Sequence, residues 1–379
     1  MDKNLRWAAG SLLVVGLGGT ELTGLERAWL RLIRPGGIIL FRRNIADPEQ
    51  TRALLDEATG LGALHGARCV DVEGGTVNRL RDALAPMPSA QAVASALPGR
   101  AMGALAREHG ELIGRAVKAF GFNTTLAPVV DLAMPESADV LGTRAPAPDP
   151  KTVVEFTRAF LAGLAAQGVA GCGKHFPGLG GAVGDTHFVT PEIGRDWQQV
   201  WNNDLVPYRE LHAAMPMIMT NHAAFSRTQS KNVPASASPF WITTVLRKRI
   251  GYRGMILTDD LEMGGILKFS PVEDAAVATI RAGSDLLEIC HSAELILRTY
   301  EALISAGEQS AAFRTLLLRR AREVERKRAR MYASGVPKPL SAKQYEALRE
   351  RIARFRDKVT AAGKAESLIP RTTSPAENV

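Results

Sequence analysis

The sequence has little of what marks membrane-spanning proteins. Its longest uncharged apolar run, Trp7 to Thr20, is shorter than the about 20 residues that a bilayer requires, and glycines interrupt its second half. Lys3 and Arg6 precede this run as they would in a signal peptide, but no small-x-small cleavage site follows. We therefore expect the first core strand of a cytoplasmic protein here, and no membrane insertion.

Cysteine is also scarce. The three cysteines, Cys69, Cys172 and Cys290, lie far apart, each inside an apolar run. Buried free thiols in a reducing compartment explain this pattern better than disulfides do. The sequence has no P-loop and no Cys-x-x-Cys motif, and Gly16-Leu-Gly-Gly-Thr20 lacks the spacing of a dinucleotide-binding turn.

The excess of positive charge is confined to the end of the chain. The formal net charge is +8 at pH 7, but residues 309–379 hold 17 basic and 7 acidic side chains, whereas residues 1–308 hold 30 and 32. A basic tail is no reason to regard the main body as a nucleic-acid binder, so we expect no nucleic acid partner. For the tail itself, a solvated amphipathic helix is favoured over contact with an anionic glycan, nucleic acid or membrane surface.

Short apolar runs alternate with longer amphipathic stretches along most of the chain. The expected strands are 12–17, 37–41, 69–72, 124–130, 170–175, 216–220, 255–258 and 285–290. The expected helices between them are 21–33, 48–60, 101–120, 150–167, 197–214, 239–250 and 272–282. Strands and helices in this order predict an α/β protein with a (β/α)8 TIM-type barrel, and a doubly wound open sheet is the alternative.

The pattern changes after residue 306. Residues 309–333 predict one Arg-rich helix whose apolar positions can pack on the barrel. Prolines then interrupt the chain, a second basic helix is expected at about 341–359, and the last dozen residues are expected to be disordered. We therefore predict a single barrel domain over 1–335, including a C-terminal helix, and a basic helical and disordered tail over 336–379.

Polar side chains collect where the expected strands end. The third to seventh runs close with ionisable or amide groups, namely Asp71, Glu73, Asp131, Lys174, His175, Asn221, His222, Asp259 and Asp260. The active sites of βα barrels are built at the carboxyl ends of the strands, so this rim is the expected site.

Two of these segments carry the clearest chemistry. The glycine-rich loop after the fifth run ends in Asp185-Thr-His187, which places a carboxylate within hydrogen-bonding reach of an imidazole and suits a general acid/base near neutral pH. Asp259 and Asp260 repel each other if both are buried and ionised. One is expected to be a catalytic or ligand carboxylate and the other a solvated or paired neighbour.

A metal site is an alternative for the same strand-end residues. His175, His187, His222 and Asp259 could be ligands, as in barrel amidohydrolases, but that pattern needs a His-x-His pair at the end of the first strand, where Leu17-Gly-Gly19 stands. We therefore expect neither a metal nor a cofactor.

Five motifs together resemble those of family 3 glycoside hydrolases, and most closely the bacterial β-N-acetylhexosaminidase branch. They occur in the family's order and spacing, as Asp71-Val-Glu-Gly-Gly-Thr-Val-Asn-Arg79, Ala127-Pro-Val-Val-Asp131-Leu, Lys174-His175-Phe-Pro-Gly, Asp185-Thr-His187 and Thr258-Asp259-Asp-Leu-Glu-Met263. The resemblance covers residues 10 to 305. Each motif alone is weak, and the combination is specific.

The resemblance implies a retaining exo-hydrolase that releases terminal β-linked N-acetylglucosamine. It places the nucleophile at Asp259 and the acid/base at His187, with Asp185 as its partner. The sugar-binding positions that it implies are Asp71, Arg79, Arg144, Lys174 and His175. The usual substrates of the branch are cytoplasmic peptidoglycan fragments from cell-wall recycling, so the implied partner is a carbohydrate.

Some positions depart from the family pattern. Leu179 stands where a second histidine is usual, and Thr76 where arginine is common. Thr143-Arg144-Ala145-Pro146 replaces a segment that usually resembles Asp-Arg-Ala-Phe. These departures leave the implied catalytic residues in place and affect the expected substrate preference and loop motion.

Three other functions fit the same residues. A β-glucosidase of the family usually takes its acid/base from a second domain, and the chain after 306 is too short to form one. A phosphorolytic member would use phosphate in place of water as the acceptor. This reaction fits a histidine acid/base, because histidine repels the phosphate anion less than a carboxylate does. A non-catalytic glycan-binding barrel is the alternative from another class.

Overall fold

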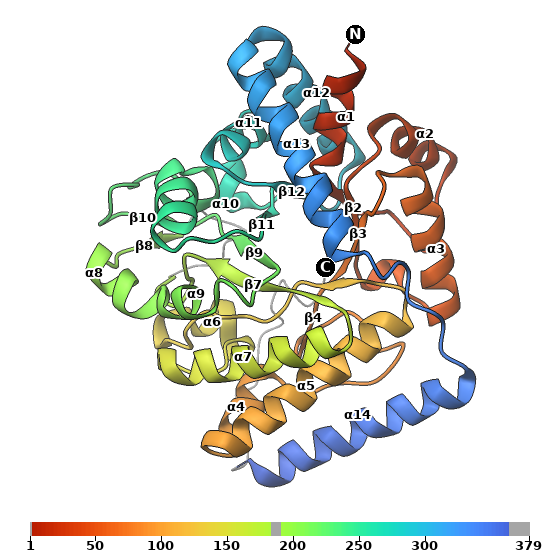
Figure 1. Cartoon of the computed structure of the whole chain (residues 1–379). Helices are drawn as coiled ribbons and strands as arrows, with labels where there is room; N and C mark the ends of the chain where they lie inside the picture. The colour runs from red at the N-terminus through yellow and green to blue at the C-terminus, as the bar shows by residue number, and fades with distance from the viewer. Residues whose placement is uncertain (1, 183–190, 364–379) are drawn as a thin grey trace.

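The computed structural model describes residues 2–182 and 191–363 and forms a closed parallel barrel (Figure 1). The barrel order is β1-β12-β11-β9-β7-β6-β3-β2, which closes because β1 pairs with both β2 and β12. Its strands are β1 Leu13–Val15, β2 Gly37–Leu40, β3 Ala67–Val70, β6 Thr124–Thr125, β7 Ala170–Phe176, β9 Met217–Thr220, β11 Met255–Asp260 and β12 Leu286–Ile289. The predicted (β/α)8 TIM-type fold is confirmed, and the doubly wound alternative is wrong.

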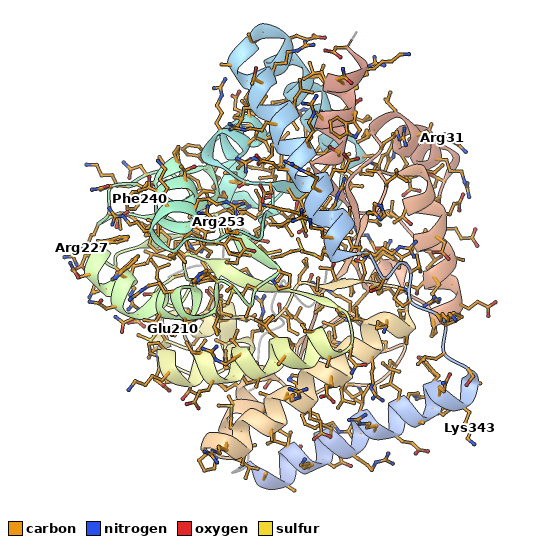
Figure 2. All side chains as sticks on the ribbon, viewed as in Figure 1. Arg31, Glu210, Arg227, Phe240, Arg253 and Lys343 are labelled. Atoms are coloured by element: carbon orange, nitrogen blue, oxygen red, sulfur yellow. The ribbon has the colours of Figure 1, made fainter. Side chains whose placement is uncertain are left out.

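Helices cover the outside of the barrel. They are α1 Lys3–Ser11, α2 Gly24–Ile33, α3 Pro48–Leu61, α4 Ala90–Ala96, α5 Gly99–Ala119, α6 Ala138–Leu141, α7 Pro150–Ala166, α8 Trp197–Gln199, α9 Val206–Leu211, α10 Gly264–Leu267, α11 Val272–Ala282, α12 Ala293–Gln309, α13 Ala311–Met331 and α14 Ala342–Ala362. Asp47 and Asp149 cap α3 and α7, since each accepts a backbone N–H in the first turn of its helix. Charged side chains such as Arg31, Glu210 and Lys343 project from this outer layer (Figure 2).

Short elements complete the structure. An antiparallel hairpin joins β4 Val72–Gly74 to β5 Val77–Asn78, and a small parallel sheet pairs β8 Glu192–Ile193 with β10 Ala224–Phe225. The π-helical segments are η4 Val200–Asp204 and η6 Phe240–Arg249, and the 3-10 turns are η1 Arg42–Asn44, η2 Pro135–Ser137, η3 Gly142–Arg144 and η5 Ala235–Ala237.

Three expected elements differ from the structure. The apolar run at the N-terminus is not all strand, because α1 extends to Ser11 before β1 begins. The strand expected over 124–130 is regular only at Thr124–Thr125, because Pro128 has no N–H for the ladder, although Val129 still bridges Lys174. The helix expected over 197–214 is divided into α8, η4 and α9, and Pro207 occupies the first turn of α9.

The C-terminal helices belong to the packed structure. α13 packs on α1 and α12, as expected for the Arg-rich helix, and α14 packs on α4 and α5. Leu348, Ile352, Phe355 and Val359 form the buried face of α14. The solvated amphipathic helix expected there is therefore helical but only partly solvated, while the domain division at residue 335 stays a prediction. The disorder expected for the last dozen residues lies outside the described residues.

The remaining observations concern membrane and redox features. None of the helices in the described ranges is both long and apolar enough to cross a membrane. Cys69, Cys172 and Cys290 are buried free thiols, as the sequence predicts. The barrel and its helix layer therefore rest on apolar packing and hydrogen bonds.

Candidate active site

The predicted site residues that the structure describes lie at the carboxyl ends of the strands. Asp71 directly follows β3, and Lys174 and His175 lie near the end of β7. Asp259 is at the end of β11, while Arg79 and Arg144 come from the β5 hairpin and from η3. Asp185 and His187 lie outside the described residues.

Glu73, in β4, is the centre of a buried ion-pair network. Its carboxylate accepts two hydrogen bonds from Arg144, from Nε and from Nη2, both at 2.8 Å, and Lys174 Nζ lies 2.7 Å from Oε1. Burial acts to raise the pKa of Glu73, but Arg144 and Lys174 outweigh it and hold the pKa well below its ordinary value. Glu73 is therefore a fixed anion that holds two cations at the rim.

Asp71 shares one of these cations. Lys174 Nζ donates to Asp71 Oδ1 at 2.7 Å, and Arg79 Nη2 lies 4.0 Å from Oδ2. The β4–β5 hairpin brings Arg79 back to this point, because the Arg79 backbone N–H donates to the Asp71 carbonyl at 3.0 Å. Burial lowers the pKa of Lys174, but Asp71 and Glu73 together raise it above its ordinary value, so the ammonium stays charged.

His175 is oriented by a second buried carboxylate. His175 Nδ1 lies 2.7 Å from Asp131 Oδ2, and Asp131 also accepts the backbone N–H groups of His175 at 3.1 Å and Leu179 at 2.8 Å. His175 Nε2 lies 3.5 Å from Arg144 Nη2. With its proton on Nδ1, the ring donates to Asp131 and turns an acceptor toward Arg144. The network thus runs without a break from Asp71 to Asp131.

The tandem carboxylates at the end of β11 have different environments. Asp259 Oδ1 accepts the backbone N–H of Asp260 at 3.0 Å. Burial, with the nearby Glu262 carboxylate, raises the pKa of Asp260 to about 8. Both carboxyl groups are half-buried, and Asp260, which has the raised pKa, is the paired neighbour of the two because it lies 3.6 Å from His291 Nε2.

His222, after β9, supports this end of β11. Its Nε2 donates to the Asp260 carbonyl at 3.0 Å and its Nδ1 lies 2.7 Å from Ser236 Oγ. Burial lowers the pKa of His222, which keeps the ring neutral. Two members of the metal alternative, His175 and His222, are thus already hydrogen-bonded to protein groups.

Two departures from the family pattern have visible structural consequences. Leu179 is 2% exposed, so an apolar side chain fills its position while its backbone N–H holds Asp131. Thr76 offers its carbonyl to Arg81 Nη1 at 3.3 Å, in the turn of the β4–β5 hairpin.

Sequence reasoning assigned no role to Glu73 or Asp131. Both stand in the quoted motifs, and Glu73 lies two residues after Asp71, the spacing that places side chains on one face of an extended strand. That spacing was the available signal for Glu73. The contact between Asp131 and His175 joins two different strand ends and has no local signal.

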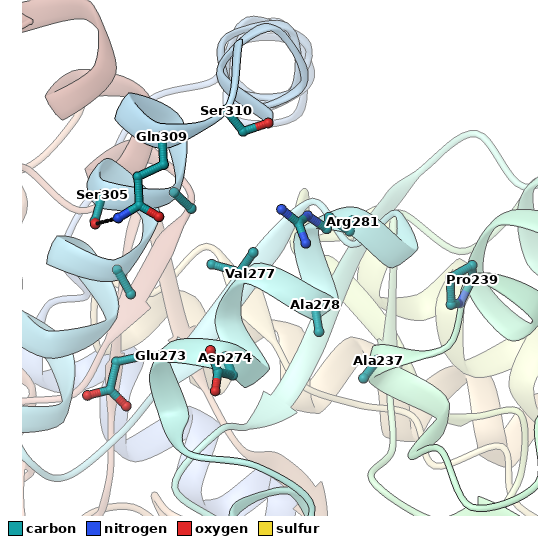
Figure 3. Close-up of a pocket in the computed structure, with 12 residues that line it drawn as sticks. Ala237, Pro239, Glu273, Asp274, Val277, Ala278, Arg281, Ser305, Gln309 and Ser310 are labelled. Atoms are coloured by element: carbon teal, nitrogen blue, oxygen red, sulfur yellow. Dashed lines mark hydrogen bonds between the residues drawn. The ribbon is translucent and has the colours of Figure 1, made fainter. Parts of the chain in front are cut away.

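A separate cleft of about 840 Å³ lies on the helix layer, away from this rim (Figure 3). Its lining residues are Ala237, Pro239, Glu273, Asp274, Val277, Ala278, Arg281, Ala302, Ser305, Ala306, Gln309 and Ser310. None of the predicted site residues is among them, so the cleft is not part of the candidate active site.

The chain is similar to known proteins over most of its length. The glycosyl hydrolase family 3 N-terminal domain matches residues 9–321. A β-hexosaminidase of Methylococcus capsulatus is 38% identical over 286 residues, which cover 75% of this chain and 84% of that protein. A second β-hexosaminidase, from Stenotrophomonas maltophilia, is 34% identical over 310 residues, 81% of this chain and 91% of that protein.

Solved structures give the same result. Native NagZ from Neisseria gonorrhoeae superimposes with a TM-score of 0.74 at 26% identity, covering 91% of this chain and 97% of that one. A glycoside hydrolase family 3 β-N-acetylglucosaminidase from Paenibacillus sp. has a TM-score of 0.82 at 29% identity, covering 93% of this chain and 68% of that one. The family match over residues 9–321 and these relatives show that the chain belongs to glycoside hydrolase family 3, as a glycosidase of the β-hexosaminidase group.

Proposed function

We propose that the chain is a retaining exo-β-N-acetylglucosaminidase that removes terminal N-acetylglucosamine from peptidoglycan fragments in the cytoplasm. The observation that carries the proposal is the buried network of Asp71, Glu73, Arg144, Lys174 and His175, which lies at the same rim as Asp259. A fixed set of donors and acceptors beside a carboxylate is what recognition and cleavage of one sugar unit require.

The network suits a polar, uncharged ring. Asp71 offers a carboxylate that can accept hydrogen bonds from vicinal hydroxyls, and Arg144 and Lys174 are donors for hydroxyl or acetamido oxygens. Their two charges are balanced by Glu73 and Asp71 within the protein, so a neutral sugar can bind without leaving a buried charge uncompensated. Arg79, paired with Asp71, completes the group.

Asp259 is the proposed nucleophile. Its carboxylate attacks the anomeric carbon while the glycosidic C–O bond breaks, and the leaving oxygen takes a proton from His187. Water then attacks the glycosyl-enzyme ester, His187 takes the water proton, and Asp259 is released with the β-configuration retained in the product. Asp185 would orient His187 and stabilise its charged form.

The two catalytic roles have different tests. Asp259→Asn keeps the size of the side chain and removes its nucleophilic charge, so we expect turnover of 4-nitrophenyl N-acetyl-β-glucosaminide to be abolished. Asp357→Asn, on the surface of α14, is the matched control and should leave turnover unchanged. Wild-type turnover in Asp259→Asn would contradict the assignment.

For His187, the leaving group separates the roles. In His187→Ala, we expect hydrolysis of a sugar with a poor leaving group to fall by about 10²–10⁴-fold, because general acid catalysis is lost. Cleavage of the activated 4-nitrophenyl substrate should fall less, because nitrophenolate leaves without a proton. Equal losses on both substrates would argue against His187 as the acid.

The substrate and reaction class need a third experiment. We expect wild-type enzyme to cleave the acetamido substrate and not the matching β-glucoside, and to release N-acetylglucosamine from its disaccharide with anhydro-N-acetylmuramic acid. Proton NMR of the first product should show the β-anomer. A phosphate requirement with sugar phosphate as product would instead identify a phosphorolytic member, and cleavage of the β-glucoside alone would identify a β-glucosidase.

A further inference from the structure

A cluster of metal-ligating side chains lies beside the network just described and has no part in the proposed hydrolysis. Asp260, Cys290 and His291 each present one ligand atom, and these atoms all lie within 4.8 Å of one another. Asp260 Oδ2 and His291 Nε2 are 3.6 Å apart. Two ligands at about 2.0–2.2 Å from a tetrahedral Zn²⁺ are separated by a similar distance, so the pair needs little movement to bind one ion.

Backbone contacts hold each of these side chains in place. Asp260 Oδ1 accepts the Glu262 backbone N–H at 3.0 Å, which leaves Oδ2 facing His291. Glu262 Oε1 accepts the N–H groups of His291 at 2.9 Å and Ser292 at 2.8 Å, at the start of α12. The His291 ring also packs on Phe41, with 5.2 Å between ring centroids. Such supporting contacts orient ligands before a metal arrives.

A fourth donor lies directly behind the cluster. Glu288, in β12, is 3% exposed, and its Oε1 accepts the Cys290 thiol with 3.3 Å between the heavy atoms. Its other oxygen, Oε2, is buried without a hydrogen-bond partner among the described residues. A buried carboxylate oxygen without a partner is costly, and a bound cation would relieve that cost.

Arg43 lies next to the cluster and is held by backbone carbonyls. Arg43 Nη2 donates to the Cys290 carbonyl at 2.7 Å and Nε donates to the Leu17 carbonyl at 3.1 Å. These hydrogen bonds hold the guanidinium on backbone carbonyls, so they leave the ligand atoms of Asp260, Cys290 and His291 facing one another. The cluster therefore combines thiol, imidazole and carboxyl groups, a ligand set suited to Zn²⁺.

We propose that Asp260, Cys290 and His291 bind one divalent cation of the Zn²⁺ class, with the Glu288 carboxyl group next to Cys290. When the ion binds, the Cys290 thiol and the Asp260 carboxyl group pass their protons to solvent, so that a thiolate and a carboxylate bind the metal. This site is not the metal set considered from the sequence, since it shares none of His175, His187, His222 and Asp259. It also does not depend on the proposed hydrolysis, because its test measures binding.

Cobalt titration of the full chain tests the site directly. Co²⁺ replaces Zn²⁺ in such sites and gives a thiolate-to-cobalt absorption band, which we expect to saturate at one equivalent and to disappear when Zn²⁺ is added. In Cys290→Ser the band should be absent although Cys69 and Cys172 remain. In His291→Asn the affinity should fall by about tenfold or more.

Matched variants keep the test independent of folding. His65→Asn changes an exposed histidine far from the cluster along the chain and should bind Co²⁺ like wild type. The His291 side chain is 38% exposed, so His291→Asn is expected to fold even if Cys290→Ser does not. No saturable binding in wild type, a band that persists in Cys290→Ser, or unchanged affinity in His291→Asn would each overturn the proposal.

Discussion

At the scale of single residues, Glu73 determines the electrostatics of the barrel mouth. It binds Arg144 through both carboxylate oxygens and contacts Lys174, and all of these groups are buried or nearly so. A buried network of this kind adds little net stability to the fold. Removing one member is strongly destabilising, because its partner is left as an uncompensated buried charge. Glu73 therefore acts as a positioning residue: it holds the sugar-binding groups in place, and we assign it no contact with the reacting atoms.

Glu73→Gln tests this positioning role. We expect the free energy of unfolding to fall by about 3–5 kcal/mol, since Arg144 and Lys174 lose their shared anion. We also expect kcat/KM to fall by about 100-fold, because displaced groups no longer hold the substrate in its reactive geometry. Glu57→Gln, which breaks the exposed pair with Arg27, is the control and should change neither quantity. Loss of stability with full activity would refute positioning by Glu73.

The residues of this candidate site were predictable from the sequence to different degrees. Asp71, Lys174 and His175 could be named because each stands at the end of an expected strand, whereas Arg79 and Arg144 were named only through the family resemblance. Pairings across strands could not be derived, because which strand ends touch depends on barrel closure. His291 is such a case, since only the folded chain brings it to Asp260.

At the scale of elements, α14 shows how the C-terminal segment is attached. Its Phe355 stacks on His109 of α5, with 5.7 Å between ring centroids, and Phe160 of α7 packs edge-on to the same ring at 5.4 Å. Both His109 ring nitrogens are buried, and in the described part of the chain neither has a hydrogen-bond partner. Burial lowers the pKa of His109 to about 3. The ring is therefore neutral and acts as an apolar plate between helices.

The burial of His109 predicts that the stability of the contact between α5 and α14 depends on pH. The folded chain resists protonation of His109, whereas the unfolded chain takes up a proton near the ordinary pKa of 6.5. Stability is therefore complete above pH 6.5 and falls by about 1.4 kcal/mol per pH unit below it, from this group alone. In His109→Phe that contribution should vanish, so the variant should lose less stability than wild type between pH 7.5 and 5 in urea unfolding.

A histidine without burial provides the comparison. His65→Asn should lose stability with pH in parallel with wild type, because this exposed side chain is not part of the contact between α5 and α14. If the difference between wild type and His109→Phe is the same at all pH values, protonation of His109 does not weaken this contact.

Element boundaries were predictable where local chemistry fixes them. Asp47-Pro48 and Asp149-Pro150 start α3 and α7 as expected, because cap and first-turn proline act within a few residues. The irregular strand after Thr125 and the interrupted helix before Val206 were missed. Pro128 and Pro207 were visible in the sequence, but the extent of their effect depends on the neighbouring backbone that supplies alternative hydrogen bonds.

At the scale of the whole molecule, α13 ties the chain's C-terminal region to the amino-terminal end of the barrel. Asp285, just before β12, accepts hydrogen bonds from Arg320 at 2.8 Å and Lys327 at 3.1 Å, both on α13, and from Arg247 at 2.6 Å. Arg328 Nη1 donates to the Gly36 carbonyl at 2.6 Å, just before β2. Several of the basic side chains that give the C-terminal region its positive charge therefore bind groups of the barrel. These side chains are not available to bind a polyanion.

Asp285→Asn should weaken the attachment of α13 to the barrel. Asp285 is fully buried, and burial raises its pKa, but Arg247, Lys327 and Arg320 outweigh that effect and hold the pKa below its ordinary value of 3.8. The carboxylate therefore stabilises the fold above about pH 3.8, and this contribution is lost as the pH falls through the lower folded pKa. Replacing it with an amide leaves three cations without their anion, so the free energy of unfolding at pH 7 should fall by about 3–5 kcal/mol.

Because α13 packs on both α1 and α12, thermal unfolding of Asp285→Asn should remain a single transition at a lower midpoint. An unchanged midpoint would instead mean that Asp285 does not help to couple α13 to the barrel.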